Sequence, residues 1–143
     1  MGFSFQLQHT DGEARAGELV TPHGNVSTPV FMSVATQATV KGLLPVEVES
    51  LGAEIVVCNA YHLYLRPGVD SVARLGGLHR FMGWSRPILT DSGGYQAFSM
   101  GALRKVDEDG IRFRSHIDGS EHQFTPQLAT ANQEGLGADI AMC

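Results

Sequence analysis

The sequence has few charged residues, no excess of positive charge and no long hydrophobic run. No stretch of about 18 apolar residues occurs, so we expect no transmembrane helix. The N-terminal stretch MGFSFQLQHTDG lacks a basic start and a long apolar core, so it does not resemble a signal peptide, and we expect a cytoplasmic protein. Charged residues make up 17% of the chain and hydrophobic residues 43%, a balance that favours a folded domain over a disordered chain.

The chain is also poor in features that mark nucleic-acid-binding, disulfide-rich and metal-binding domains. Its formal net charge of −5 is not that of a domain that binds nucleic acid through its own electrostatic field. Cys58 and Cys143 lie within apolar, strand-like runs, so we expect two reduced core thiols rather than a disulfide or a metal pair. The histidines show no metal-ligand spacing, since HxxxH and CxxC are both absent, and no GxGxxG loop follows a strand.

The N-terminal part of the chain has the pattern of β-structure. FSFQLQ (3–8) alternates apolar and polar residues, and the DG pair that follows is typical of a turn. ARAGELVT (14–21) is the expected return strand of a hairpin. After a second turn, TPVFMSVA (28–35) predicts a buried strand that ends near Val34.

Helix and strand patterns then alternate. LLPVEVESLGA (43–53) predicts a helix with Pro45 at its first position, and AEIVVCNA (53–60) predicts a buried strand. GVDSVARLGG (68–77) predicts a helix with Asp70 as its N-cap, and RPILTD predicts a third strand. Alternation of this kind is typical of a parallel sheet with helical crossovers.

A polar hairpin, IRFRSHIDGSEHQF (111–124), interrupts the alternation after the third strand. Thr125 and Pro126 then predict the start of another helix, and ADIAMC (138–143) a fourth strand. We therefore predict an α/β fold with four parallel strands, either a small open sheet or the N-terminal half of a (β/α)8 barrel. A β-hairpin precedes strand one and a β-hairpin is inserted after strand three. We expect residues 1–143 to be one domain truncated at strand four, the front part of a longer protein.

Polar side chains cluster at the predicted carboxyl ends of these strands, where parallel α/β folds place their functional sites. Asn59 ends the second strand, and Asp91 and Ser92 end the third. The adjoining pair Gly93–Gly94 would let a flat ligand approach the backbone. A carboxylate at this place is equally suited to capping a helix or a turn, so the spacing alone leaves both roles open.

Three neighbouring side chains have a functional and a structural interpretation. Tyr95 suits stacking on a planar base, and it also suits an ordinary place at the rim or in the core. Gln96 suits the polar edge of a purine, although exposed glutamines are common. His62, alone in its stretch, is more typical of a hydrogen-bonded structural histidine than of a catalyst.

Four ordered segments resemble the N-terminal part of the tRNA-guanine transglycosylases (queuine tRNA-ribosyltransferases), and LGADIAMC continues the likeness to the end of the chain. The segments are TPVFMSVATQATVKGLLP (28–45), CNAYHLYLRPG (58–68), GLHRFMGWSRPILTDSGGYQAFSM (77–100) and FRSHIDGSEHQFTP (113–126). Ser33 and Ala35 depart from the usual FMPVGTQ of the family. Gly94 is similar to the queuine branch, whereas archaeal relatives typically carry serine there, and FRSHIDGSEH resembles bacterial members.

The resemblance implies a (β/α)8 barrel that exchanges the wobble guanine of tRNAs with G-U-N anticodons for a 7-deazaguanine, either the pre-queuosine base or queuine. The exchange passes through a covalent ribosyl-enzyme intermediate and belongs to queuosine biosynthesis. The implied partners are tRNA and the 7-deazaguanine base, commonly in a homodimer and without a membrane. Full-length members hold Zn²⁺ through three cysteines and a histidine near their C-terminus, so no cofactor is expected in this segment.

By the same resemblance, Asp91 is the general acid/base of the base pocket and Tyr95 stacks on the bound base. Asn59 lies near the reacting ribose, and Val34 forms an apolar edge that contacts it. The remaining pocket residues implied are Ser92, Gly93, Gly94 and Gln96. The attacking aspartate of the family lies on a later strand, and the aspartate that reads the guanine edge follows the fourth strand. Both lie beyond Cys143 in the family's pattern, so we expect the chain alone to be inactive.

Two other classes of function remain open on the sequence. The first is a non-catalytic half-barrel that binds a base or tRNA, or that serves as the partner subunit of an active enzyme. The second is an unrelated barrel enzyme that acts on a small molecule, which the four ordered segments disfavour.

Overall fold

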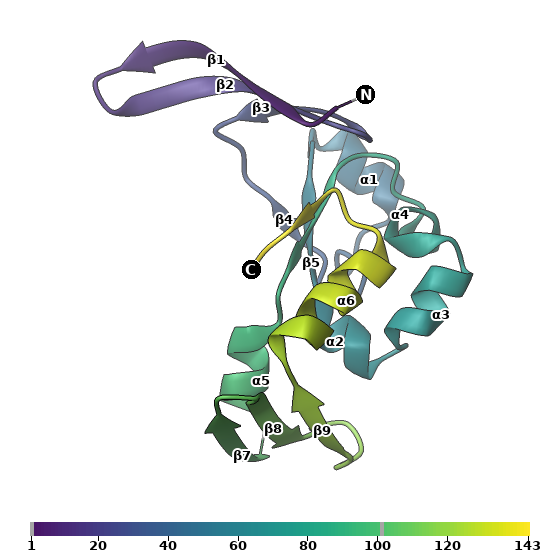
Figure 1. Cartoon of the computed structure of the whole chain (residues 1–143). Coiled ribbons are helices and arrows are strands. Elements are labelled where there is room, and N and C mark those ends of the chain that lie inside the picture. Colours follow the sequence, from purple (N-terminus) through teal and green to yellow (C-terminus); the bar gives the residue numbers. More distant parts are fainter. Residues whose placement is uncertain (1, 101) are drawn as a thin grey trace.

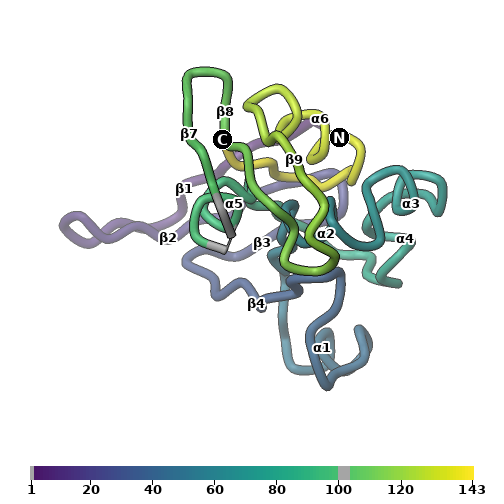
Figure 2. Tube along the Cα trace, turned by 90° about the horizontal axis from the view of Figure 1, so that it is seen from below, coloured from purple at the N-terminus to yellow at the C-terminus, as the bar shows by residue number. Residues whose placement is uncertain are grey.

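The N-terminal sheet is antiparallel and lies at one end of the molecule (Figure 1). The computed structural model describes residues 2–100 and 102–143. The sheet contains β1 (Ser4–Asp11), β2 (Ala14–Thr21) and β3 (Gly24–Thr28), paired in that order. β1 is exposed along its whole length, and the β1–β2 hairpin extends away from the rest of the chain (Figure 2).

The predicted hairpin is confirmed, but the sheet has a third strand that we did not predict. β3 pairs antiparallel with β2. Its buried residue Val26 packs with Leu89 of the central sheet and with Ile55, which directly precedes that sheet's second strand. The strand was missed because it is short and begins with Gly24 and Asn25, residue types that are typical of turns.

A parallel sheet forms the centre of the molecule. Its strands are β4 (Ser33–Val34), β5 (Val56–Asn59), β6 (Ile88–Asp91) and β10 (Ile140–Ala141). Among these four, each strand pairs in parallel with the one that follows it in chain order, which gives the spatial order β10-β6-β5-β4. The mixed α/β class with a parallel sheet is therefore confirmed. The predicted strand at 28–35 is too long, because only Ser33 and Val34 pair and Thr28 already belongs to β3.

Six helices are present in the described residues: α1 (Pro45–Ser50), α2 (Ala60–Leu65), α3 (Val69–Arg74), α4 (Gly77–Met82), α5 (Gly94–Met100) and α6 (Pro126–Leu136). Pro45 begins α1, and Thr125 caps α6 by accepting the Leu128 N–H at 3.1 Å, as predicted. Asp70 is not an N-cap: Gly68 holds that position and Asp70 lies in the first turn of α3. No helix in this part of the chain is both long and apolar enough to span a membrane.

The inserted sheet lies at the end of the molecule opposite the N-terminal sheet (Figure 1). It contains β7 (Ala102–Asp107), β8 (Gly110–Arg114) and β9 (Glu121–Phe124). The predicted β8–β9 hairpin is confirmed, with Gly119 at φ +75 in its turn, whereas β7 is an additional strand. Phe113 and Phe124 form its covered face and pack with Tyr61 of α2.

The main core lies between the parallel sheet and the helices α3, α4 and α6, which contact one another. Cys58 is fully buried there, as predicted. Cys143 is exposed after β10, so the expectation of a second core thiol is wrong. The apolar run that suggested a buried strand pairs only at Ile140 and Ala141, which leaves Cys143 outside the sheet.

We predict that Leu136→Ala lowers the free energy of unfolding of this chain by about 2–5 kcal/mol, because Leu136 is fully buried in the main core. Leu51→Ala is the matched control. Leu51 is 75% exposed, so the change should stay within about 0.5 kcal/mol. Urea unfolding measures both values, and equal losses in the two variants would contradict this assignment of the core.

Candidate functional site

The carboxyl ends of β5 and β6 bring Asn59 and Asp91 into direct contact. The two residues are partners in the parallel register. Asn59 Nδ2 donates a hydrogen bond of 2.6 Å to Asp91 Oδ2, and the backbone N–H of Ala60 donates one of 3.2 Å to Asp91 Oδ1. Both oxygens of the carboxylate are therefore held by donors from the neighbouring strand end.

Asn59 is also the N-cap of α2, and this role fixes the orientation of its amide. Its Oδ1 accepts the His62 backbone N–H at 3.1 Å, which leaves its NH₂ group to face Asp91. Its own backbone N–H donates to the Thr36 carbonyl at 3.3 Å, near the end of the adjoining strand β4. One side chain thus ties the start of a helix to the carboxylate of the next strand.

Helix α2 is the element of this site that we did not predict. Tyr61 and His62 lie in its first turn. The available signal was Asn59, a favoured N-cap, directly before AYHLYL, which contains no glycine or proline.

The environment of Asp91 acts on its pKa in two directions. Burial raises the pKa of Asp91 above its ordinary value. The N–H groups of Ala60 and Gly93, the Asn59 amide and the charge of His62 act the other way, because each stabilises the anion. The net result is a pKa above that of an exposed aspartate, which favours a role in proton transfer.

His62 lies close enough to this carboxylate to affect it. Burial lowers the pKa of His62, the nearby His116 lowers it further, and Asp91 opposes both effects. The neutral form of His62 is therefore favoured more than in an exposed histidine.

Gly93 lies where no side chain fits. Its φ is +74, and a Cβ there would be 2.6 Å from the Tyr61 backbone nitrogen and 2.7 Å from the Tyr61 Cβ. The close approach of α2 to the turn after β6 therefore requires glycine. Gly94 differs, because it begins α5 and a Cβ there would make only an ordinary contact, 3.6 Å from the Ser92 Oγ.

The other predicted residues are spread around this pair. Ser92 and Gly94 border a cavity of about 350 Å³ that residues of β8, β9, α6 and the C-terminal end also line. Asp91 and Asn59 do not line that cavity. Tyr95 is 77% exposed, Val34 is 61% exposed and Gln96 is half-buried. The structure thus brings Asn59 and Asp91 together and leaves Tyr95 and Val34 facing solvent.

Two tyrosine–histidine pairs attach the inserted sheet to α2, next to the site. Tyr61 Oη and His116 Nδ1 are 3.2 Å apart, and Tyr64 Oη and His122 Nδ1 are 2.9 Å apart. Sequence reasoning missed both pairs because their members are separated by 55 and 58 residues.

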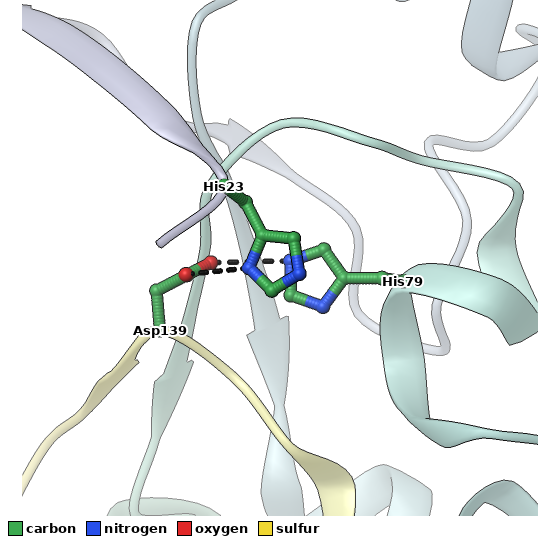
Figure 3. Close-up of side chains that lie close together, drawn as sticks. All are labelled: His23, His79 and Asp139. Atoms are coloured by element: carbon green, nitrogen blue, oxygen red, sulfur yellow. Dashed lines mark hydrogen bonds and ion pairs between the residues drawn. The ribbon is translucent and has the colours of Figure 1, made fainter. Parts of the chain in front are cut away.

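One group of metal-type side chains occurs within residues 2–100 and 102–143: His23, His79 and Asp139 (Figure 3). It lies at the other edge of the parallel sheet, where β6 and β10 begin, and not beside Asp91. Its members are far apart in the sequence, so no spacing pattern pointed to it. Cys58 is a poor ligand, because burial raises the pKa of its thiol to about 12 and keeps it protonated.

Comparison with known proteins shows where these motifs recur. The family model described as "Queuine tRNA-ribosyltransferase" matches residues 10–143. A queuine tRNA-ribosyltransferase of Herpetosiphon aurantiacus is 64% identical over 140 residues, which cover 98% of this chain and 36% of that protein. The relative from Koribacter versatilis is 60% identical over 142 residues, or 99% of this chain and 37% of that protein. The relative from Desulforudis audaxviator is also 60% identical, over 99% of this chain and 39% of that protein.

The chain therefore spans somewhat more than a third of the length of these relatives. The family model covers all but the first nine of its 143 residues. The predicted resemblance is confirmed, and the chain belongs to the queuine tRNA-ribosyltransferase family.

Proposed function

We propose that this chain supplies the base-handling part of a tRNA-guanine transglycosylase, which replaces the wobble guanine of G-U-N anticodon tRNAs by a 7-deazaguanine. Family membership supports the reaction class. The single observation that carries the proposal is the Asp91 carboxyl, held by Asn59 and Ala60 at a strand end. The partners are then tRNA and the free base, the pre-queuosine base or queuine, and the assembly is a homodimer.

We also propose that the four parallel strands are the first half of a (β/α)8 barrel and that residues 1–143 belong to that one domain. The strands are neighbours in chain order, as the first strands of such a barrel must be. Among the described strands, β4 and β10 each have a partner on one side only. The relatives are long enough to supply the strands that would complete the barrel.

Base exchange at the ribose anomeric carbon with retained configuration requires two displacements. In the first, a carboxylate oxygen bonds to C1′ as the bond from C1′ to the guanine nitrogen breaks. In the second, the incoming deazaguanine nitrogen bonds to C1′ and the carboxylate leaves. The family resemblance assigns the attacking carboxylate to an aspartate beyond Cys143. Asp91 is then the proton carrier, which protonates the departing guanine and takes a proton from the incoming base.

The remaining predicted residues have roles that suit their positions in this mechanism. Tyr95 is exposed on the first turn of α5, where its ring is free to stack on a base that has left the anticodon stack. Val34 is exposed at the end of β4 and offers an apolar contact to ribose. Ser92, which follows Asp91 in the chain, and Gln96 would supply polar groups to the base pocket. Asn59 orients the Asp91 carboxyl and would lie near the sugar.

The zinc ion expected in full-length members does not fit the residues of this chain. The family's site needs three cysteines, whereas the chain has two, one buried as a protonated thiol and one exposed. No step of the mechanism above passes through the metal. A non-catalytic subunit that binds the base or tRNA is the second candidate function.

The direct test is a chimaera in which residues 1–143 replace the matching segment of the Herpetosiphon aurantiacus relative. We expect it to incorporate labelled guanine into tRNA, and we expect the 143-residue chain alone to incorporate none. Activity of the chain alone would contradict the assignment of the nucleophile to a later strand. A folded chimaera that binds tRNA without exchanging guanine would favour the non-catalytic subunit.

Within that chimaera, we predict that Asp91→Asn lowers turnover by about 10²–10⁴-fold, the usual contribution of a general acid/base. The amide keeps the shape of the side chain but cannot carry the proton, so tRNA binding should be largely unchanged. Asp70→Asn, on the exposed first turn of α3, is the matched control and should keep full turnover. Equal turnover in the two variants would remove Asp91 from the mechanism.

We predict that Gly93→Ala lowers the free energy of unfolding of the chain by about 1–3 kcal/mol, because it combines a positive φ with a clash against the α2 backbone. In the chimaera it should also reduce exchange, since displacing α2 moves the Asn59 amide away from Asp91. Gly94→Ala, one residue later and without either constraint, should be close to neutral for stability. Chemical unfolding measures the free energy of unfolding of both variants. A Gly93→Ala protein as stable as the parent would contradict the close approach of α2 to Gly93.

A further inference from the structure

Three side chains from distant parts of the chain meet around one buried carboxylate at the amino-terminal edge of the parallel sheet (Figure 3). Asp139 precedes β10 directly, His79 belongs to α4, and His23 lies in the turn between β2 and β3. The side chain of Asp139 is 1% exposed, that of His79 is 15% exposed and that of His23 is 42% exposed. None of them takes part in the site around Asp91.

The Asp139 carboxylate uses both oxygens and has three donors. His23 Nδ1 lies 2.7 Å from Oδ1, and His79 Nε2 lies 3.1 Å from Oδ2. The backbone N–H of Ile88, at the start of β6, donates to Oδ2 at 2.9 Å. A carboxylate only accepts hydrogen bonds, so each ring nitrogen carries the proton that faces it. This satisfies a charge that would be costly to bury alone.

Two histidines and an aspartate are also a common ligand set for Zn²⁺, but the ring geometry does not suit a shared ion. Two imidazoles bound to one tetrahedral zinc at about 2.0–2.1 Å have their ring centres about 5 Å apart. The His23 and His79 rings are stacked with centroids 3.5 Å apart and an interplanar angle of 17°. Parallel rings at this distance direct their nitrogens side by side toward the two carboxylate oxygens, not toward one point between them.

We infer that His23, His79 and Asp139 form a clasp that fastens the N-terminal sheet to the start of β6 and β10, and that this clasp accepts one added proton but not two. With both rings neutral, the clasp has a net charge of −1. One added proton makes it neutral and creates an ion pair. A second would put two positive rings in stacked contact around a single negative charge.

The environment of His79 disfavours a positive charge on its ring, in agreement with the limit of one added proton. The groups that act on its ring are His23, Asp139 and the backbone of Arg86. Burial is the largest effect and lowers the pKa of His79, and His23 lowers it further, whereas Asp139 and Arg86 act against them. A proton on His79 is therefore disfavoured while its ring stays stacked on His23.

The pH dependence of stability follows from the direction in which the environment moves the pKa of His79. The folded state binds a proton at His79 less readily than the unfolded state, whose histidine titrates near 6.5. The stability that is linked to neutral His79 is therefore complete above pH 6.5 and is lost as the pH falls through the folded-state pKa of His79. Acidification should loosen the N-terminal sheet, because His23 is one of its contacts with the rest of the chain, through Asp139.

The test is a histidine NMR titration of the protein and of two variants, His23→Gln and His9→Gln. His9 is exposed on β1 of the same sheet and is the matched control. We expect the His79 midpoint to lie below 6.5, to move upward in His23→Gln and to stay unchanged in His9→Gln. A midpoint at or above 6.5, or the same midpoint in all three proteins, would overturn the clasp.

Amide exchange and zinc binding test the clasp independently of the histidine titration. Backbone amide exchange of residues 14–28, corrected for the intrinsic effect of pH, should accelerate below pH 6 in the unmodified protein and in His9→Gln. In His23→Gln it should depend less on pH. Titration with Zn²⁺ tests the metal alternative, and tight one-to-one binding that disappears in His23→Gln but persists in His9→Gln would replace the clasp by a metal centre.

Discussion

The hydrogen bond between Asn59 and Asp91 is the interaction on which the candidate site depends. It joins the ends of two neighbouring parallel strands, and the same asparagine caps α2 through its other amide atom. The orientation of the Asp91 carboxyl is therefore set by the start of a helix as well as by its own strand. Because α2 approaches the turn at Gly93 closely, the strand ends, the helix and the turn pack together as one unit. A group that exchanges protons with a bound base needs this fixed geometry.

The unit also explains how a half-buried carboxylate is tolerated. Removing a charge from water is costly unless hydrogen bonds replace the lost solvation. Asp91 receives them from Asn59, Ala60 and Gly93, and burial still raises its pKa. Burial is the largest effect on this pKa, and the hydrogen bonds and His62 oppose it by stabilising the anion. The inserted sheet reinforces the unit from outside, since its two histidines hold the α2 tyrosines.

The features that could be predicted from the sequence are those encoded locally. Alternating patterns and helix-start residues such as Pro45 and Thr125 indicated the parallel sheet and two of its helices. The rule that parallel strands present their carboxyl ends on one edge placed Asn59 near Asp91. The missed features are short or depend on distant partners. β3 begins with turn-forming residues, and the clasp joins residues up to 116 positions apart. No local pattern shows that the backbone of α2 approaches Gly93.

Strand β6 connects the two polar centres of the molecule, and its length decides how one can influence the other. Its first residue, Ile88, donates to the clasp carboxylate, and its last, Asp91, is the candidate proton carrier. At about 3.3 Å per residue, the three steps between them span about 10 Å. The groups that act on the pKa of Asp91 are Ala60, Gly93, Asn59 and His62, and no residue of the clasp is among them. This separates stability at one edge of the sheet from chemistry at the other.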